Sequence, residues 1–524
     1  MTTLLHALPL ITAQRSPDAF ALEHASSRYT YGQLQADIES LSTGLIRLGI
    51  ERYDRVAVYL PKQYETVVSM FSASHAGCVM VPVNPLLKPA QVEHILNDCS
   101  VHALITSEDR LFALQGILNK CHRLKHIILT SASKATTNTS FNLWHLYDLL
   151  NQSRTTFASH RVIDTDMAAI LYTSGSTGKP KGVILSHRNL VTGAHSVASY
   201  LQNTSEDKLL AALPLSFDYG FSQLTTAFHV GACVHLMEYL LPQDLIRKVS
   251  ETRITGLAGV PPLWNQLANL EWPQSAKDAL RYFTNSGGSM PDTTLAKLRN
   301  SLPKTKPFLM YGLTEAFRST YLPPEEIDRR PGSIGKAIPN AEVLVVRPDG
   351  SVCDPHEPGE LVHRGSLVAL GYWNNPDYTA LRFKPVPTQS KSLPIAELAV
   401  WSGDIVKKDE DGYLYFIGRT DEMIKTSGYR VSPNEIEEVC LATGLVSEVV
   451  AVGIHHAELG QAIAVIAVPN MQTTESSVPL LNKCKEQLPA FMVPIHIEFR
   501  KKLPRNQNGK YDRTLLASEL SETE

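Results

Sequence analysis

Short apolar runs alternate with helical stretches along the first half of this chain, and this alternation limits the folds it can adopt. After Tyr31, apolar residues recur at helical spacing, and Thr30 with Gln33 forms a capping box before them. Apolar runs follow as "RVAVYL", "HALITS", "HIILTS", "AAILYTS" and "ACVHLM". Strands that alternate with helices are typical of parallel sheets covered by helices. The sequence therefore predicts an α/β fold, with mixed, mostly parallel sheets layered with helices.

The pattern changes twice in the second half. Between Arg330 and Gly371, prolines and glycines separate short strand-like runs, which predicts a β-rich subdomain over about 330–417. A second change comes near Gly418. Beyond it we expect a helix from Asn434 to Ala442, the strands "SEVVAVGI" and "QAIAVIAVP", and a helix from Leu480 to Leu488. We predict an N-terminal domain over 1–417 and a smaller α+β domain over 422–524.

Composition excludes several classes of protein. The 524 residues include 43% hydrophobic and 19% charged residues, and the net charge is -3, without the basic excess that favours nucleic acid binding. The seven cysteines form no CxxC pair, which indicates neither a zinc site nor a disulfide framework. The N-terminus lacks a basic start, and no run of 18 apolar residues occurs. We predict a cytoplasmic protein without a membrane span.

The stretch "YTSGSTGKPKG", Tyr172 to Gly182, predicts a phosphate-binding loop. It follows the apolar run "MAAILY", so it leaves the end of a strand, and its small residues, hydroxyls and lysines suit a bound anion. Pro180 stands five residues after Gly175, which excludes the Walker A spacing, and no GxGxxG occurs. The loop therefore fits neither a Walker A site nor a dinucleotide fingerprint.

The sequence of this loop resembles the signature loop of the adenylate-forming superfamily. This superfamily includes acyl-CoA synthetases, luciferases and the adenylation domains of nonribosomal peptide synthetases. The resemblance extends over about residues 28–513 and includes "YTYGQL", "NSGGSMP", "YGLTE", "WSGDIV", "GRTDEMIKTSGYRVSPNEIE" and "PRNQNGKYDR", in the family's order. The chain looks most like bacterial AMP-forming acyl-CoA ligases associated with exosortase systems, a label that leaves the substrate open.

The resemblance implies an ATP-dependent acid–thiol ligase. Such enzymes convert a carboxylic acid and ATP into acyl-AMP and pyrophosphate, and a thiol then attacks the mixed anhydride. The implied phosphate-loop residues are Thr173, Ser174, Gly175, Ser176, Thr177, Gly178, Lys179 and Lys181. Other implied nucleotide contacts are Gly287 and Gly288 against adenine, Tyr311 stacked on adenine, Asp404 and Arg419 at the ribose, and Arg430 at a phosphate.

Three residues are implied in catalysis. Thr314 resembles a hydroxyl donor to the α-phosphate, and Glu315 resembles the ligand of the Mg²⁺ that accompanies ATP. Lys510 resembles the lysine that reaches the α-phosphate and the reacting carboxylate. In the family the small domain rotates between the two half-reactions. The resemblance implies a hinge over 418–421 at Asp421, and a thiol tunnel at Gly428.

The acid is less well defined. The aromatic-histidine pair that many acyl-CoA synthetases carry after "LPL" is absent, and "LPLSFDYGFSQL" instead resembles the "FD" of amino-acid-activating domains. Asp218 then either pairs with a substrate ammonium or caps a helix. Arg318 pairs either with a second carboxylate on the substrate or with Asp218 itself. We also expect Tyr219, Ser222 and Met310 near the acid.

The thiol acceptor is CoA or the phosphopantetheine of a separate carrier protein, with Lys501 and Lys502 as candidates for the 3′-phosphate of CoA. One alternative is a stand-alone amino-acid adenylating enzyme, for example of the prolyl type, that loads a carrier protein. Another is a non-catalytic nucleotide-sensing protein. The retention of Glu315, Asp404, Lys510 and the loop argues against that second alternative.

Overall fold

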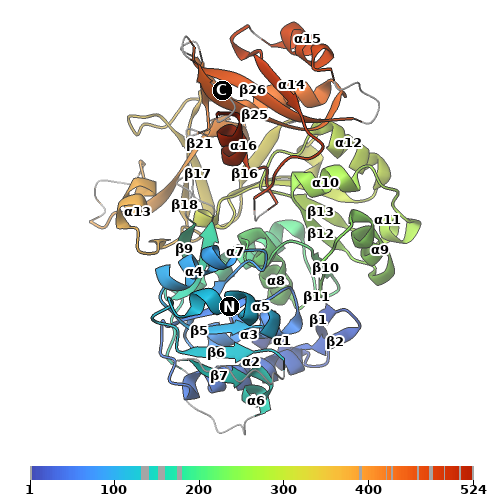
Figure 1. The fold of residues 1–524 in the computed structure, drawn as a ribbon. Coiled ribbons are helices and arrows are strands. Elements are labelled where there is room, and N and C mark those ends of the chain that lie inside the picture. The colour runs from blue at the N-terminus through green and yellow to red at the C-terminus, as the bar shows by residue number, and fades with distance from the viewer. Residues whose placement is uncertain are drawn as a thin grey trace.

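Three β-sheets and the helices that cover them make up the structure (Figure 1). The computed structural model describes residues 3–131, 141–151, 160–173, 180–388, 392, 394–419, 422–426, 429–456, 459–470, 476–488, 490–506 and 509–521. In Figure 1 the C-terminal elements, in red, lie at the opposite end from the first helices and strands, in blue, with the green and yellow elements between them.

The first sheet is built from the N-terminal third of the chain and one later strand. Its eight strands have the order β19-β9-β8-β4-β3-β5-β6-β7, and β3 to β8 pair in parallel. The strands are β3 (Arg55–Tyr59), β4 (Val79–Pro82), β5 (Val101–Thr106), β6 (His126–Leu129), β7 (Asn142–His145), β8 (Met167–Thr173), β9 (Lys181–Ser186) and β19 (Gly371–Tyr372).

The second sheet has 14 strands in the described residues, in the order β17-β18-β21-β22-β16-β15-β14-β13-β12-β10-β11-β1-β2, with β20 beside β21. Its strands are β1 (Phe20–His24), β2 (Ser27–Thr30), β10 (Lys208–Ala211), β11 (Cys233–Leu236), β12 (Gly256–Gly259), β13 (Tyr282–Asn285), β14 (Lys306–Tyr311), β15 (Thr320–Leu322), β16 (Ser333–Ala337), β17 (Ala341–Val346), β18 (Gly359–Gly365), β20 (Phe383–Pro385), β21 (Leu398–Lys408) and β22 (Leu414–Arg419). The predicted β-rich stretch thus extends this sheet through antiparallel pairs.

The third sheet lies wholly in the C-terminal part of the chain. Its strands are β23 (Ile424–Thr426), β24 (Tyr429–Val431), β25 (Val446–His456), β26 (Gly460–Pro469) and β27 (His496–Phe499). The apolar residues of this part form their own clusters, one between the sheet and α14 and α15 and one against α16. Because β22 ends at Arg419 and β23 begins at Ile424, the chain passes from the second sheet to the third across the predicted hinge.

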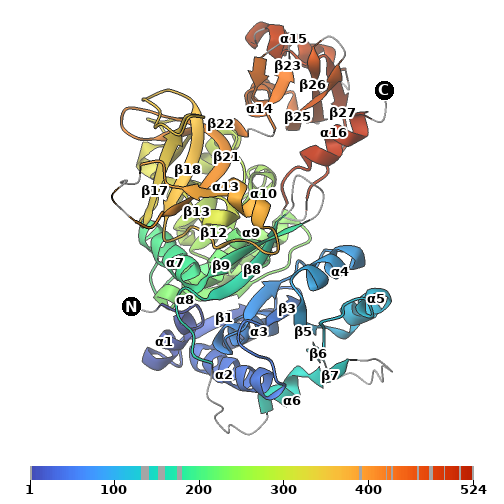
Figure 2. The same cartoon turned by 90° about the vertical axis from the view of Figure 1, so that its left-hand side faces the viewer.

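Helices cover the faces of these sheets, as the sequence predicts, and Figure 2 shows them from a second side. They are α1 (Ala7–Arg15), α2 (Tyr31–Arg47), α3 (Tyr64–His75), α4 (Pro89–Asp98), α5 (Glu108–Leu118), α6 (Leu146–Asn151), α7 (His187–Leu201), α8 (Asp218–Val230), α9 (Pro242–Thr252), α10 (Pro261–Leu267), α11 (Gln274–Ala279), α12 (Asp292–Ser301), α13 (Pro376–Arg382), α14 (Pro433–Ala442), α15 (Val478–Gln487) and α16 (Arg513–Ser521). The short 3₁₀ helices are η1 (Thr314–Ala316), η2 (Pro324–Glu326) and η3 (Ala490–Met492).

The local predictions for α2 are confirmed. The Thr30 hydroxyl accepts a hydrogen bond from the backbone of Gln33, and the Gln33 side chain accepts one from the backbone of Thr30. This reciprocal cap satisfies two N–H groups that the first turn leaves without helical partners. The helix buries Leu34, Ile38 and Leu41 against the core. Among the described residues, no helix has the length and apolar character needed to span a membrane.

Four buried histidines make stability depend on pH. Burial lowers the pKa of His187 and His363 to about 4, and that of His6 and His235 to about 3, from an ordinary value of 6.5. The unfolded chain therefore binds protons below pH 6.5 that the folded chain does not bind. Stability is fully present above pH 6.5 and falls as the pH drops towards 4.

We expect the unfolding temperature to fall between a pH of about 6.5 and about 5, with a cost of up to about 1.4 kcal/mol per histidine and pH unit. His363→Gln removes one titrating group beside Ser319 and should make this dependence shallower. The matched control is His122→Gln, at an exposed position. Thermal unfolding followed by circular dichroism measures both. A dependence that His363→Gln leaves as steep as before would contradict this account.

Candidate functional site

The segment "YGLTE" places three candidate residues at the end of β14. Tyr311 is the last residue of the strand, and Thr314 and Glu315 begin η1. The Thr314 side chain is 8% exposed, and its hydroxyl donates a hydrogen bond of 3.1 Å to Oδ1 of Asp218. Thr314 and Asp218 are 96 residues apart in the sequence. The fold thus joins the segment implied at the nucleotide to the segment implied at the acid.

Asp218 is the first residue of α8 and is 4% exposed. The helix cap is Phe217, which makes no side-chain capping bond, and the Asp218 carboxylate faces Thr314 instead. Capping of a helix therefore does not describe Asp218. Burial raises the pKa of this carboxyl above its ordinary value, and the positive charges of Arg318 and Lys510 oppose that rise.

Lys510 reaches this region from the C-terminal part of the chain. Figure 2 shows the chain before α16 running from the C-terminal elements towards the green ones. Nζ of Lys510 lies 5.9 Å from the centroid of the Phe217 ring. Burial lowers the pKa of the Lys510 ammonium, and the negative charge of Asp218 opposes that change. A lysine and a carboxylate implied in one reaction thus lie within each other's electrostatic influence.

Gly287 makes room for Lys510. This glycine has a φ of +80°, which other residues rarely adopt, and a Cβ placed on it would lie 3.0 Å from Cε of Lys510. Gly288 faces Pro261, where an added Cβ would lie 3.0 Å from Cγ. The family resemblance implies that both glycines lie against adenine. The structure adds that Gly287 sets how closely Lys510 can approach.

The candidate ribose contacts lie together at the junction of three strands. Asp404 of β21 and Arg419 of β22 are directly paired in the sheet, and Nη1 of Arg419 lies 3.6 Å from Oδ1 of Asp404. The Tyr311 hydroxyl donates a hydrogen bond to the other carboxylate oxygen. Burial raises the pKa of both Asp404 and Tyr311. Oδ1 of Asp404 has no hydrogen-bond partner in the described residues and is suited to accept a hydroxyl.

Glu315 and Lys181 are linked by two tyrosines that sequence reasoning missed. The hydroxyl of Tyr372 donates a hydrogen bond of 2.5 Å to Oε1 of Glu315. The ring of Tyr372 lies 4.8 Å from that of Tyr378, and Nζ of Lys181 lies 3.4 Å from the Tyr378 centroid. Tyr372 belongs to β19, which pairs with β9. The pairing of β19 with β9 brings Tyr372 to the site from a distant part of the sequence. No pattern of neighbouring residues therefore marks these tyrosines as site residues.

Several candidates are described only in part. Thr173 and Lys181 pair at the ends of the antiparallel strands β8 and β9, so the phosphate loop connects a hairpin. Its remaining candidates lie outside the described residues: Ser174, Gly175, Ser176, Thr177, Gly178 and Lys179. Asp421 and Gly428 also lie outside them. For Arg430 the structure gives the place of its backbone in β24.

One of the candidate acid residues, Tyr219, lies directly against Arg318. Its guanidinium carbon lies 4.7 Å from the centroid of the Tyr219 ring, and the Tyr219 hydroxyl shares a hydrogen bond of 2.5 Å with Thr284. Ser222 is buried on the same helix as Tyr219. The sulfur of Met310 accepts a hydrogen bond of 2.9 Å from the hydroxyl of Tyr200. The predicted acid residues therefore lie on α8, β14 and the segment after η1.

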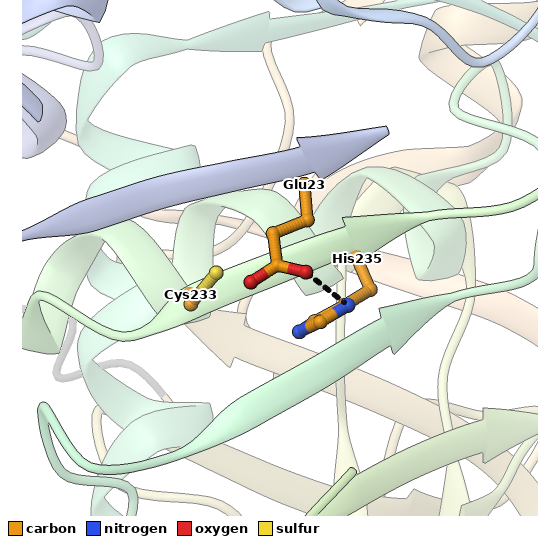
Figure 3. Close-up of side chains that lie close together, drawn as sticks. All are labelled: Glu23, Cys233 and His235. Carbon is orange, nitrogen blue, oxygen red and sulfur yellow. Dashed lines mark ion pairs between the residues drawn. The ribbon is translucent and has the colours of Figure 1, made fainter. Parts of the chain in front are cut away.

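A separate cluster lies between β1 and β11, where Glu23, Cys233 and His235 come together (Figure 3). Oε2 of Glu23 lies 3.4 Å from Nδ1 of His235, and Arg28 pairs with the same carboxylate at 3.2 Å. The positive charges of Lys248, Lys208 and Arg28 add to the effect of burial in lowering the pKa of His235. A divalent cation would face these charges and compete with Arg28. We therefore assign the cluster to the contact between strands.

Two family models match the chain. The model described as "AMP-binding enzyme" matches residues 11–373, and the one described as "AMP-binding enzyme C-terminal domain" matches residues 435–510. The second match ends at Lys510. Together they include the candidate residues from Thr173 to Arg318, the strands β25, β26 and β27 of the third sheet, and Lys510.

Curated relatives match over nearly the whole chain. A long-chain-fatty-acid–CoA ligase of Salmonella typhimurium is 30% identical over 558 residues, which cover 97% of this chain and 96% of that protein. A linear gramicidin synthase of Brevibacillus parabrevis is 28% identical over 96% of this chain, which corresponds to 9% of that protein.

Solved structures share the fold. ATP-bound MatB from Rhodopseudomonas palustris superposes with a TM-score of 0.87 at 24% identity, and the match covers 100% of both chains. The anthranilate CoA ligase AuaEII in complex with anthranoyl-AMP gives a TM-score of 0.88 at 23% identity, with 100% of this chain and 99% of that chain covered.

Gly287→Ala tests the contact with Lys510. An alanine there adopts an unfavourable φ and crowds Cε of Lys510, which costs about 1–2 kcal/mol. We expect the amides of residues 510–512 to exchange hydrogen roughly tenfold faster, because the segment must leave its contact more often. The control is Gly116→Ala, where an added Cβ meets nothing within 4 Å. Equal exchange at 510–512 in the two variants would refute the contact.

Proposed function

Because the chain belongs to the AMP-binding enzyme family and is an AMP-forming acid–thiol ligase, we propose that it activates a carboxylic acid as acyl-AMP and transfers the acyl group to coenzyme A. The observation that carries the proposal is that Lys510 lies beside Phe217, the residue before Asp218, while Asp218 accepts the hydrogen bond from Thr314. A cation, a hydroxyl donor and a carboxylate from three distant segments thus lie in one region.

In the first half-reaction a carboxylate oxygen of the acid forms a bond to the α-phosphorus of ATP, and the bond from that phosphorus to the pyrophosphate oxygen breaks. We assign to Lys510 the stabilisation of negative charge on the α-phosphate and the entering carboxylate. The Thr314 hydroxyl is oriented by Asp218 and can rotate towards a phosphate oxygen. The phosphate loop would hold the departing pyrophosphate.

We propose that Glu315 binds the Mg²⁺ that accompanies ATP. Carboxylate oxygen is the ligand that Mg²⁺ prefers, and the hydrogen bond from Tyr372 fixes the orientation of the Glu315 carboxylate. The bound ion supplies charge neutralisation for the phosphates. For the nucleoside, we assign the ribose to Asp404 and Arg419, whose carboxylate and guanidinium face each other at the end of β14.

In the second half-reaction the thiol sulfur bonds to the acyl carbon, the bond from that carbon to the AMP oxygen breaks, and the thiol proton is released. We assign CoA as the acceptor because the relatives that match this chain over most of their own length are named CoA ligases. Lys501 and Lys502 are exposed and remain candidates for its 3′-phosphate. The rotation at Asp421, the tunnel at Gly428 and the cytoplasmic location remain predictions.

The two alternatives are less well supported. A stand-alone amino-acid adenylating enzyme is consistent with the gramicidin synthase relative and with Asp218. That relative is matched over only 9% of its length, whereas the Salmonella typhimurium CoA ligase is matched over 96%. No comparison indicates a separate carrier protein. A nucleotide sensor without catalysis would not need Lys510 held against Gly287.

Lys510→Ala separates the two half-reactions. With ATP, CoA and a panel of acids, we expect acid-dependent pyrophosphate release to fall by roughly 100-fold or more, because the charge on the α-phosphate loses its counterion. Thioester formation from a supplied acyl-AMP should change little. The matched control is Lys485→Ala, an exposed lysine on α15. If Lys510→Ala releases pyrophosphate at the normal rate, the assigned role of this lysine is wrong.

The lowered pKa of Lys510 predicts an alkaline limit for the first half-reaction. Lys510 is cationic only below its pKa, which burial holds under the ordinary 10.5, so pyrophosphate release should fall as the pH rises towards that value. Lys510→Arg keeps its charge throughout this range and should remove the alkaline fall while lowering the maximum rate. If the unaltered enzyme and Lys510→Arg lose activity at the same alkaline pH, a group other than Lys510 is responsible for the alkaline limit.

A further inference from the structure

Arg318 is a buried arginine whose position is set by the backbone before it. Its side chain is 2% exposed. Phe317, the preceding residue, is completely buried and has a φ of 56°, a conformation that is unfavourable for a bulky residue and is retained only where packing enforces it. An added Cβ on Gly193 would lie 2.3 Å from the Phe317 ring, so α7 holds that ring closely. The chain is therefore constrained to direct Arg318 inward.

The contacts of Arg318 leave part of its hydrogen-bonding capacity unused. Nη1 donates a hydrogen bond of 3.0 Å to the hydroxyl of Ser286, and the guanidinium lies over the Tyr219 ring. Nε and Nη2 have no hydrogen-bond partner in the described residues. A guanidinium is always charged and carries five N–H groups, so this is a buried cation with unsatisfied donors.

Asp218 does not satisfy these donors. Its carboxylate accepts the hydrogen bond from Thr314, and within the described residues it forms no ion pair with Arg318. Arg318 acts on Asp218 only as a nearby positive charge that opposes the rise in its pKa. The sequence leaves two partners open for Arg318, which are Asp218 and a second carboxylate on the substrate. The structure does not contain the pair with Asp218.

The reacting carboxylate is a poor partner for Arg318. That carboxylate loses its charge when it becomes part of the mixed anhydride, so a guanidinium bound to it would stabilise the acid more than the product of activation. We assign the reacting end to Lys510, which lies near the Phe217 ring and Gly287. A buried cation with unsatisfied donors is stabilised most by an acceptor that keeps its negative charge through the reaction.

We infer that the acid activated by this enzyme carries a second carboxylate, which binds Nε and Nη2 of Arg318 beside Tyr219 and Ser286. This inference rests on the proposed function and specifies its substrate class, a dicarboxylic acid. The planar donors of arginine match a carboxylate with two parallel hydrogen bonds. An acid with only an apolar tail would leave these donors without a partner, so it should be a poorer substrate.

The test compares diacids with monoacids of the same chain length. Succinate, glutarate, adipate and suberate are each assayed beside the matched monocarboxylate and the monomethyl ester, through acid-dependent pyrophosphate release and thioester formation. We expect kcat/KM for the best diacid to exceed that for its monoacid and its ester by roughly 10- to 100-fold. Arg318→Met should abolish this preference and leave the KM for ATP unchanged, because Arg318 binds the acid.

Three further variants allow the inference to be tested even if Arg318→Met folds poorly. Ser286→Ala removes the acceptor that orients Arg318 and should reduce the preference for diacids, while Arg318→Lys should retain part of it. Arg247→Met is the matched control, since Arg247 is exposed on α9. Thermal unfolding confirms that each variant is folded.

Two results would overturn the inference, and they can be told apart from failure of the proposed function. Activation of monoacids as efficient as that of every diacid would show that Arg318 binds no second carboxylate. If the Arg318→Met variant still prefers diacids, a residue other than Arg318 must bind the second carboxylate. In both cases the acid–CoA ligase itself stands. If no acid supports pyrophosphate release while ATP still binds, the proposed function fails as well.

Discussion

The hydrogen bond between Thr314 and Asp218 holds the site together. Both side chains are buried, and the bond links the segment after β14 to the first turn of α8. A buried hydrogen bond to a charged acceptor contributes about 1.5–3 kcal/mol, and either partner alone would be left unsatisfied. Tyr311 and Glu315 lie in the same short segment as Thr314. The bond therefore also helps to hold the residues that we assign to the ribose and to Mg²⁺ in position.

Around that bond, the fold keeps charged groups away from water and leaves them incompletely paired. Burial raises the pKa of Asp218 and Asp404 and lowers that of Lys510. Each shift means that the charged form is less stable than it is in water. Substrates that bring phosphates, hydroxyls and carboxylates supply the missing partners. A site of this kind contributes little to stability when empty and gains most from binding the reacting groups.

Sequence patterns predicted most of the helices and strands, because local rules govern them, whereas the candidate site residues were implied by the family resemblance. The capping box at Thr30 and the helix and strand runs of the last 100 residues depend on neighbours along the chain. What the patterns could not give depends on contacts between distant segments. Tyr372 reaches Glu315 only because β19 pairs with β9. The choice between two partners for Arg318 likewise required the positions of Ser286, Tyr219 and Asp218.

A crystal structure of the enzyme with a non-hydrolysable acyl-AMP analogue of a dicarboxylic acid tests the account most directly. The account predicts that Nζ of Lys510 and the Thr314 hydroxyl contact the position of the α-phosphate, that the ribose contacts Asp404, and that the free carboxylate binds Arg318. An acyl chain that extends away from Arg318, or an analogue bound without contact to Lys510 and Thr314, would contradict it.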